Sequence, residues 1–492
     1  MTTPQKIDFN FKRVMDPVHG PIGVSALEAR IINESKAFSR LRGVKQLGLA
    51  HLVFPGADYS RFSHSIGVCH VTGRILQAIR NQVNITDGEV QRYRLAGLLH
   101  DLGHYPFSHA MEDALSNEYH SRVSITAKSQ VASNEQPEAD HPPFNHEHLG
   151  KEILNTDEEL QDILSQSRPR ISAKNIHEIF TKENPPRFAN VISSDLDADR
   201  IDFLLRNSFH TGLPYGNVDI THILGQLRVD DKDRICLTHK ALRSADHLFL
   251  GRFFDYQQIP FNKTVVALEA ALQDVIAALV KENRIDGSRK AIIERITNKT
   301  WCDFDDSWVL ERIRELYRDT EDELLRLKAR SILYRRPAKL VGEVEYIKLL
   351  GEKEDDAKRE FRQNLGTIAK EMQRWADQFS IDKSLWYVWT RSGLRLTKDG
   401  SRKPLPDDDL DNAHDDRGSS QLIRIGSSKG ASIPIVKHEN SLMNVISNYG
   451  FFALRIYVLF PTGMEHTRGS IIDQIIQDQP DFPWKKPGSM FK

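Results

Sequence analysis

The spacing of apolar residues is the feature that most restricts how this chain folds. Along most of the first 330 residues, apolar positions recur every three or four residues, and strict apolar/polar alternation is scarce. This period is typical of α-helices that bury one face. It is clearest in a stretch that follows Arg61 to Ser65, in one from about 89 to 104 and in one from about 193 to 207.

The C-terminal part contains one stretch with the composition of a strand. Residues 451–459, FFALRIYVL, are rich in β-branched and aromatic side chains. We therefore expect a mainly α protein, with a helical core and a smaller α/β C-terminal lobe. The predicted parts are an N-terminal segment at 1–50, a helical domain at 51–335, with a polar loop at 120–143, and a C-terminal lobe at 336–492, with an acidic connector at 404–420.

Composition excludes several classes of protein. The 492 residues include 67 Lys+Arg and 68 Asp+Glu, for a formal net charge of −1, which argues against a strongly basic coat for nucleic acid. Three cysteines without CxxC spacing indicate neither a disulfide framework nor a thiolate zinc site. No signal core or membrane-spanning stretch is visible. We expect a cytoplasmic protein without a membrane partner.

One basic run offers a weak indication of nucleic-acid binding. Residues 326–339, RLKARSILYRRPAK, carry six basic side chains and one aromatic ring, which can follow phosphates. Such a run is more often a solvated helix face, and we favour that interpretation.

Histidines are concentrated in one part of the chain, since ten of the 19 lie within residues 51–148. A divalent cation needs imidazoles or carboxylates that converge from several elements. His64 starts one predicted helix, the His100-Asp101 pair lies near the end of another, and Asp199 belongs to a third. A metal site is one interpretation. Structural hydrogen bonding is the other, because that is the commoner role of a single histidine.

Acidic residues follow a helical spacing in the third stretch. Asp195, Asp199, Asp202 and Arg206 are four, three and four residues apart, which predicts one stripe of one helix. Like charges on one face repel unless cations compensate them. A bound metal would do so, and so would a solvated stripe paired with Arg200 and Arg206.

Six motifs identify a family resemblance. They are DPVHGPI (16–22), RLRGVKQLG (40–48), VFPGADYSRFSHSIGV (53–68), LAGLLHDLGHYPFSH (95–109), NHEHLG (145–150) and SSDLDADRIDFLLRNSFHTG (193–212). In this order and spacing the chain resembles the HD-domain deoxynucleoside triphosphate triphosphohydrolases over about residues 12–265. The resemblance implies an HD catalytic domain within 51–335. It also implies metal-dependent hydrolysis at the α-phosphate, which releases a nucleoside and inorganic triphosphate.

The resemblance implies roles for the matching residues. The metal ligands would be His64, His100, Asp101 and Asp199. The catalytic residues would be His104, His109, Glu112 and His146, with His109 as proton donor to the 5′-oxygen and Glu112 orienting its ring. The substrate-binding residues would be Gln46, Arg61, Arg200, Asp202, Phe203 and Asn207. The cation is divalent, and this ligand set suits Mg, Mn, Fe, Zn or Ni.

Several positions depart from the family pattern where the sugar would bind. Phe203 stands where a tyrosine is expected, and Asn207 and Glu112 stand where aspartates are expected. Pro260 and Asn262 replace a common tyrosine and histidine. Exclusion of ribonucleotides is therefore less supported than triphosphohydrolase chemistry. A ring could instead come from Tyr256.

The resemblance also concerns regulation. Residues 12–20, together with Arg40 and Arg42, resemble a segment that binds activating nucleotides between subunits, and Lys12, Asp16 and Arg42 keep the pattern. A homo-oligomer, tetramer or hexamer, with nucleotide activation is therefore expected. Two alternatives stay open, namely an HD phosphodiesterase or nucleotidase that acts on other phosphoesters, and a nucleotide sensor without catalysis.

Overall fold

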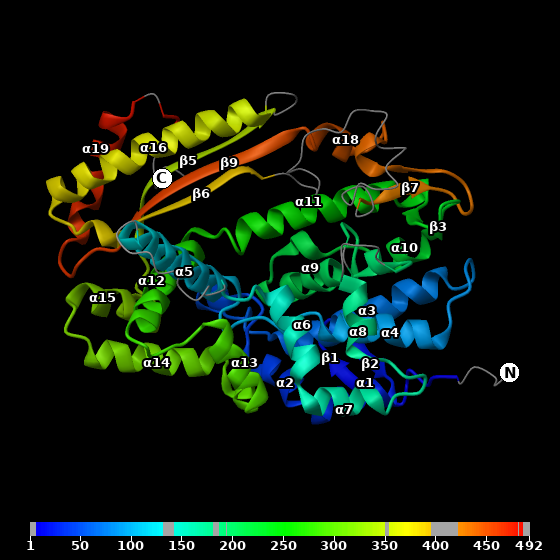
Figure 1. Ribbon diagram of the computed structural model, residues 1–492. Helices are drawn as coiled ribbons and strands as arrows, with labels where there is room; N and C mark the ends of the chain where they lie inside the picture. Colours follow the sequence, from blue (N-terminus) through cyan, green and yellow to red (C-terminus); the bar gives the residue numbers. More distant parts are fainter. Residues whose placement is uncertain are drawn as a thin grey trace.

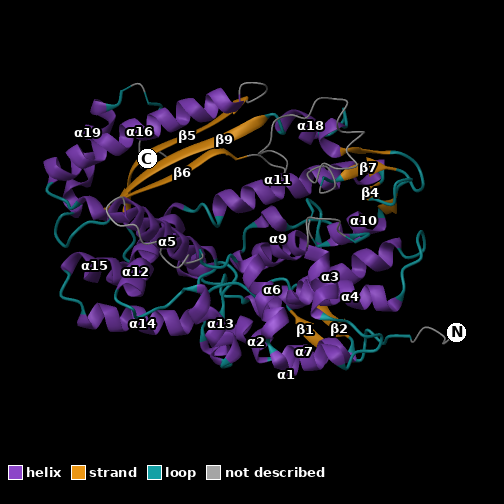
Figure 2. Ribbon diagram, in the orientation of Figure 1, coloured by secondary structure: helices purple, strands orange, loops and turns teal. Residues whose placement is uncertain are grey.

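The computed structural model describes residues 6–130, 142–180, 186–192, 194–349, 354–394, 422–480 and 482–485. Helices make up most of these ranges, and the strands gather in small sheets at separate places (Figures 1 and 2). The prediction of a mainly α protein with a β-containing C-terminal region is confirmed. Within the described ranges, no helix combines the length and the apolar character needed to cross a membrane.

The elements follow one another in this order. The helices are α1 (Ala26–Glu34), α2 (Lys36–Ser39), α3 (Arg61–Ile79), α4 (Asp87–Leu99), α5 (His109–Gln130), α6 (His146–Thr156), α7 (Glu158–Ser165), α8 (Ala173–His177), α9 (Ala198–Thr211), α10 (Ile220–Gly225), α11 (Leu242–Gln258), α12 (Lys263–Lys281), α13 (Arg289–Thr297), α14 (Asp306–Asp319), α15 (Glu323–Leu333), α16 (Glu354–Phe379), α18 (Leu442–Ile446) and α19 (Arg468–Asp478). The strands are β1 (Lys12–Asp16), β2 (Gly20–Val24), β3 (Leu227–Val229), β4 (Ile235–Leu237), β5 (Lys339–Leu349), β6 (Trp386–Leu394), β7 (Arg424–Gly426), β8 (Ser432–Pro434) and β9 (Tyr449–Val458).

Helices α3, α4 and α9 pack together in the larger hydrophobic core. They correspond to the three predicted helices, but local capping moves their ends. The second helix begins and ends earlier than predicted, because Thr86 and Glu89 form a capping box and the chain turns after Leu99. The third begins later, because the Asp197 side chain accepts a hydrogen bond from the N–H of Arg200.

The late start of α9 corrects the predicted acidic stripe. Asp195 precedes the helix and is fully buried, with its carboxylate 3.5 Å from Nη1 of Arg252. It therefore does not share a helix face with Asp199 and Asp202. Those two carboxylates remain one turn apart on α9.

An antiparallel sheet with strand order β5-β9-β6 forms the C-terminal lobe. Strand β9 is the strand predicted from the sequence, whereas β5 and β6 were not predicted. Helix α16 lies along one side of this sheet, and α5 and α12 lie on the other (Figure 1). Trp375 of α16 is fully buried in the core of the lobe, which also includes Val266 and Ala267 of α12. The lobe thus packs directly against a helix of the helical domain.

The two predicted domains also share a second sheet. Its strand order is β3-β4-β7-β8, and β7 runs parallel to β4. The boundary at residue 335 stays a prediction. The chain beyond it contributes β7 and β8 to a sheet whose first two strands belong to the helical domain. The predicted loop at 120–143 is wrong as far as residue 130, where α5 ends. Residues 131–141 and the connector at 404–420 lie outside the described residues.

A glycine permits the close approach of α3 and α9. A Cβ on Gly67 would overlap the Asp202 carboxylate and lie 2.5 Å from Nη2 of Arg206. We predict that Gly67→Ala lowers the free energy of unfolding by about 1–3 kcal/mol, because the buried ion pair must move. The control is Gly366→Ala on α16, where a Cβ meets nothing within 4 Å. It should raise stability by about 0.5–1 kcal/mol. Denaturant unfolding of both variants measures the difference, and equal stability would contradict the packing argument.

Candidate metal centre and substrate cavity

A cavity of about 1,020 Å³ opens where residues of α3, α4, α6, α9, α12 and β6 meet. Most of the predicted site residues line it, namely Gln46, Arg61, His100, Asp101, His104, His109, His146, Asp199, Arg200 and Phe203. The other predicted residues, His64, Glu112, Asp202 and Asn207, are not part of its wall. The fold therefore brings the predicted set to one place, while the role of each residue stays a prediction.

The four predicted metal ligands converge at one end of the cavity. Nε2 of His64 lies 3.0 Å from Oδ1 of Asp199 and 4.0 Å from Oδ2 of Asp101. Nε2 of His100 lies 3.2 Å from Oδ1 of Asp101 and 3.8 Å from Oδ1 of Asp199. Two imidazole nitrogens and two carboxylates thus face a common point, as cation ligands do.

The outer hydrogen bonds of both imidazoles suit metal binding. His64 donates from Nδ1 to Asp202 over 2.7 Å, and His100 donates from Nδ1 to the carbonyl of Gly97 over 2.9 Å. With Nδ1 committed to a protein acceptor, each ring has Nε2 turned toward the cluster, where it can bind a cation once its proton is lost. Nε2 of His100 is buried and has no hydrogen-bond partner among the residues that the structure describes. These residues fit a divalent cation.

Both carboxylates of the cluster, Asp101 and Asp199, are held in their charged form. Burial opposes ionisation of Asp101, yet Arg61, His100 and His104 hold its pKa well below the usual value. Burial alone would lower the pKa of His64, but hydrogen bonds to Asp199 and Asp202 raise it to about 9. The carboxylates thus attract positive charge to the point where a cation would bind.

Behind His64 lies a network of ion pairs around Asp202, a residue that was predicted to bind substrate. Asp202 is fully buried and contacts Arg206 through two oxygens at 2.9 Å. It also accepts a hydrogen bond of 2.7 Å from Nε2 of His19, and Arg206 donates to Asp16 over 2.9 Å. Asp202 therefore orients His64 from behind the wall, which does not match its predicted contact with substrate. The sequence signal for this network is the DPVHG motif, which contains Asp16 and His19.

Asn207 is likewise a structural residue in this geometry. It is fully buried, accepts a hydrogen bond of 2.5 Å from the Tyr59 hydroxyl and donates one of 2.8 Å to Asp255. Its side chain is thereby committed to neighbouring protein groups. The predicted substrate contact of Asn207 is not supported by this position.

Three histidines form a second wall of the cavity. The His104 and His146 rings stack at 4.2 Å, and His146 donates from Nδ1 to Glu112 over 2.9 Å. Nδ1 of His109 is 3.6 Å from Glu112, and its side chain is 67% exposed. Glu112 therefore orients His146, whereas the sequence analysis assigned it to His109. Burial alone would lower the pKa of His146, but Glu112 raises it above its usual value.

The loop between α4 and α5, which contains His104 and leads into His109, has a strained backbone. Phe107 and Ser108 have φ angles of 54° and 55°, which residues other than glycine seldom adopt. The N–H of Phe107 donates to Asp306 over 2.8 Å, and Arg61 donates to the Ser108 hydroxyl over 2.8 Å. Gly103 allows this loop to contact α6 closely, since a Cβ there would overlap the His146 carbonyl.

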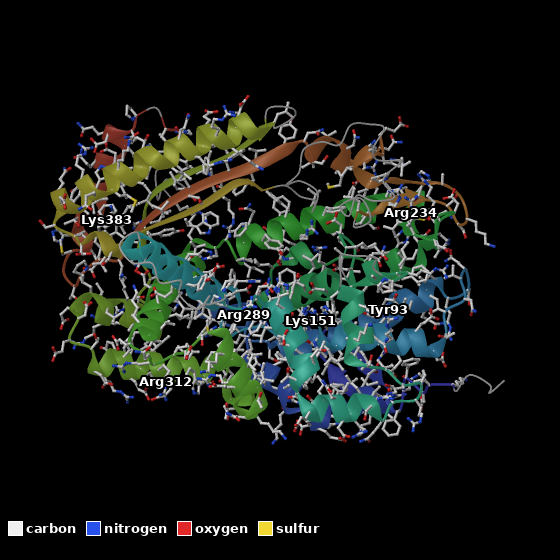
Figure 3. The ribbon with its side chains drawn as sticks, in the orientation of Figure 1. Tyr93, Lys151, Arg234, Arg289, Arg312 and Lys383 are labelled. Carbon is white, nitrogen blue, oxygen red and sulfur yellow. The ribbon has the colours of Figure 1, made fainter. Side chains whose placement is uncertain are left out.

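Cationic and aromatic residues complete this part of the cavity. Arg61 and Arg200 both line it, as does Lys151 of α6, which is labelled in Figure 3. Phe203 and Tyr256 also line it, with ring centroids 6.0 Å apart. Arg61 is already paired with Asp101 over 2.7 Å.

We predict that either His100→Ala or Asp199→Asn strongly lowers the amount of Mn²⁺ or Fe²⁺ that the purified protein retains, because the first removes an imidazole ligand and the second replaces a charged carboxylate by a neutral amide. Metal content per chain is measured by inductively coupled plasma mass spectrometry. His148→Ala is the control, since this exposed histidine lines the same cavity outside the donor cluster. Metal retention by both ligand variants at the level of the control would refute the assignment.

Asp202→Asn provides a separate test of the network behind His64. The amide keeps the shape of the carboxylate but removes the charge that orients His64. We expect metal affinity to fall roughly 10-fold to 100-fold, as happens when partners of metal ligands are replaced. A competition titration with a fluorescent chelator measures this affinity. Unchanged affinity would show that His64 needs no such support.

Comparison with known proteins agrees with this geometry. Residues 61–168 match the model of the HD domain. The uncharacterized protein MJ1154 of Methanocaldococcus jannaschii is 28% identical over 313 residues, which cover 63% of this chain and 59% of that protein. A Dictyostelium discoideum protein named deoxynucleoside triphosphate triphosphohydrolase SAMHD1 homolog is 30% identical over 275 residues, or 54% of this chain and 48% of that protein.

Solved structures extend the likeness in fold. A phosphohydrolase from Bacteroides thetaiotaomicron superposes with a TM-score of 0.63 at 21% identity, over 91% of this chain and 99% of that one. The curated relatives, by contrast, are matched over only about half of their length. His64, His100 and Asp101 all lie within the matched segment. Residues 61–168 of this chain are therefore an HD domain, and its histidine and aspartate cluster is suited to a divalent metal.

Proposed function

We propose that this protein is a metal-dependent phosphohydrolase that cleaves deoxynucleoside triphosphates at the α-phosphorus and releases a nucleoside and inorganic triphosphate. The observation that carries the proposal is a cavity in which the cluster of His64, His100, Asp101 and Asp199 adjoins cationic side chains and a histidine wall. The name of the Dictyostelium discoideum relative supports the same substrate class.

Residues in different parts of the site would bind the cation, the triphosphate and the sugar. His64, His100, Asp101 and Asp199 would hold the cation, which when bound supplies positive charge to phosphate oxygens and acidifies a water molecule. Arg61 and Arg200 bind the triphosphate, because a guanidinium fork matches phosphate oxygens. Gln46 binds the sugar 3′-hydroxyl through a buried Oε1 that has no hydrogen-bond partner in the described part of the chain.

The leaving 5′-oxygen needs a proton, and His146 is the best placed donor. Glu112 fixes its Nδ1 and stacking on His104 fixes its ring plane, and the Glu112 carboxylate raises its pKa against the effect of burial, which favours the protonated ring. His109 lies beside the same carboxylate and is more exposed, so we assign it to contact with phosphate. This assignment differs from the expectation from the sequence, in which His109 is the proton donor and His146 a further catalytic residue.

Regulation by nucleotides and assembly into a tetramer or hexamer are part of the proposal. Two of the three matching residues have intramolecular partners, since Asp16 is paired with Arg206 and the Arg42 guanidinium lies 3.5 Å from the centroid of the Phe62 ring. An activating nucleotide would therefore act on residues linked to the metal cluster. Light scattering with and without added nucleotides tests the assembly.

The reaction is tested by incubating the protein with each dNTP and NTP in Mg²⁺ and in Mn²⁺, followed by anion exchange of the products. We predict inorganic triphosphate and free nucleoside in equal amounts, because the bond to the 5′-oxygen of the nucleoside is cleaved. Orthophosphate or pyrophosphate in their place would favour the nucleotidase and phosphodiesterase alternative. Bound but unhydrolysed nucleotide would favour a sensor.

The pH profile tests the proton donor. We predict that kcat falls as pH rises through the raised pKa of His146, because only the protonated ring can donate. Glu112→Gln removes the charge that raises this pKa, so the fall should move to lower pH. His146→Ala should lower kcat by roughly 10²-fold to 10⁴-fold, and His109→Ala by less. The opposite order of the two alanine variants would return the donor role to His109.

A further inference from the structure

One arm of the cavity is formed by residues that no sequence motif identified. Glu269 and Gln273 of α12 line it, together with Trp389 and Arg391 of β6. Strand β6 belongs to the C-terminal lobe, so the lobe supplies part of the cavity wall.

A row of aromatic rings connects this arm to the metal cluster. Ring centroids are 6.0 Å apart between Phe203 and Tyr256, 6.0 Å between Tyr256 and Phe261, and 5.2 Å between Phe261 and Trp389. All four side chains line the cavity. The row begins on α9, one turn from Asp199, and it ends at the lobe. A flat apolar group attached to a sugar at Phe203 would therefore lie along Phe261 and Trp389.

Two opposite charges at the end of this row are not paired with each other. Glu269 makes no hydrogen bond or ion pair within the described part of the chain, and burial raises its pKa to about 7. The Arg391 guanidinium lies 4.7 Å from the Phe261 ring centroid and 5.0 Å from that of Trp389, and its one hydrogen bond goes to the Thr390 carbonyl. An acceptor and a multiple donor thus face the same space without contact.

We propose that this arm binds the base of the nucleotide substrate and selects guanine. Glu269 accepts hydrogen bonds from N1–H and the 2-amino group, Arg391 donates to O6 or N7, and Phe261 and Trp389 stack on the ring. The pairing of arginine with guanine O6 and N7 is a common specific contact, and each good pair discriminates strongly between bases. Adenine presents an amino group where guanine presents O6, and it offers no N1–H to the carboxylate. This inference rests on the proposed function, which places the triphosphate at the metal cluster and so directs the base toward the arm.

Nucleosides test the arm without requiring catalysis. Binding of deoxyguanosine, deoxyinosine and deoxyadenosine to the full chain is measured by saturation-transfer NMR titration. We expect deoxyguanosine to bind roughly 10-fold tighter than deoxyadenosine, with deoxyinosine between them because it lacks the 2-amino group. Glu269→Gln should abolish most of this preference, and Arg391→Met should weaken deoxyguanosine binding roughly 10-fold. Equal affinities in the wild type, or a preference for another base, would overturn the proposal.

A matched control and a kinetic measurement complete the test. Glu294→Gln removes an exposed carboxylate of α13 outside the cavity, and it should keep the wild-type preference. The ratio of kcat/KM for dGTP to that for dATP should fall in Glu269→Gln and stay unchanged in Glu294→Gln. A wild type that prefers dGTP and a Glu269→Gln variant with the same preference would refute the base site while leaving the hydrolase intact. Absence of triphosphate release from every nucleotide would refute the hydrolase, and the nucleoside titration would still decide the base site.

Discussion

The geometry of the site depends on the hydrogen bonds that the buried carboxylate of Asp202 accepts. This carboxylate receives hydrogen bonds from His64, His19 and Arg206 at a position without solvent exposure. Burying these charges is costly unless each has a partner, and together they satisfy one another. Burial alone would raise the pKa of Asp202, but the attraction of Arg206 and the hydrogen bonds from His19 and His64 hold it well below its usual value. A permanently charged acceptor therefore fixes the His64 ring with Nε2 toward the cluster before any cation arrives.

The same network gives the N-terminal hairpin a role in the catalytic region. Strands β1 and β2 place Asp16 against Arg206 and His19 against Asp202. A displacement of this hairpin would change the support of His64 without touching the cavity. Regulation through the N-terminal segment thus has a physical route to the metal cluster, because the two regions share one set of ion pairs.

Some of this structure could be predicted from the sequence and some could not, depending on whether a feature is set by nearby residues or by packing between distant elements. Contiguous signals such as the His100-Asp101 pair at the end of an apolar helix predicted the cluster, because helix periodicity places the residues. Helix ends depended on capping contacts such as that of Asp197, which periodicity does not report. Glu269 and Arg391 could not be predicted, because these two residues are 122 positions apart in the chain. Only the packing of β6 on α12 brings them together.

Charge is distributed unevenly within a nearly neutral protein. With a net charge of −1, the molecule as a whole exerts little long-range attraction on an anionic nucleotide. The cavity differs, since Arg61, Arg200 and Lys151 line the region near the metal cluster while Glu269 lies in the aromatic arm. In a cleft with low-dielectric walls, such a pattern acts over short distances and orients the ligand as well as attracting it. In the proposed function, Arg61 and Arg200 would bind the triphosphate, and the aromatic arm would be left for the uncharged base. On the same proposal, the C-terminal lobe, which supplies Arg391 and Trp389 to that arm, would act on which nucleotide is retained rather than on the chemistry at the phosphorus.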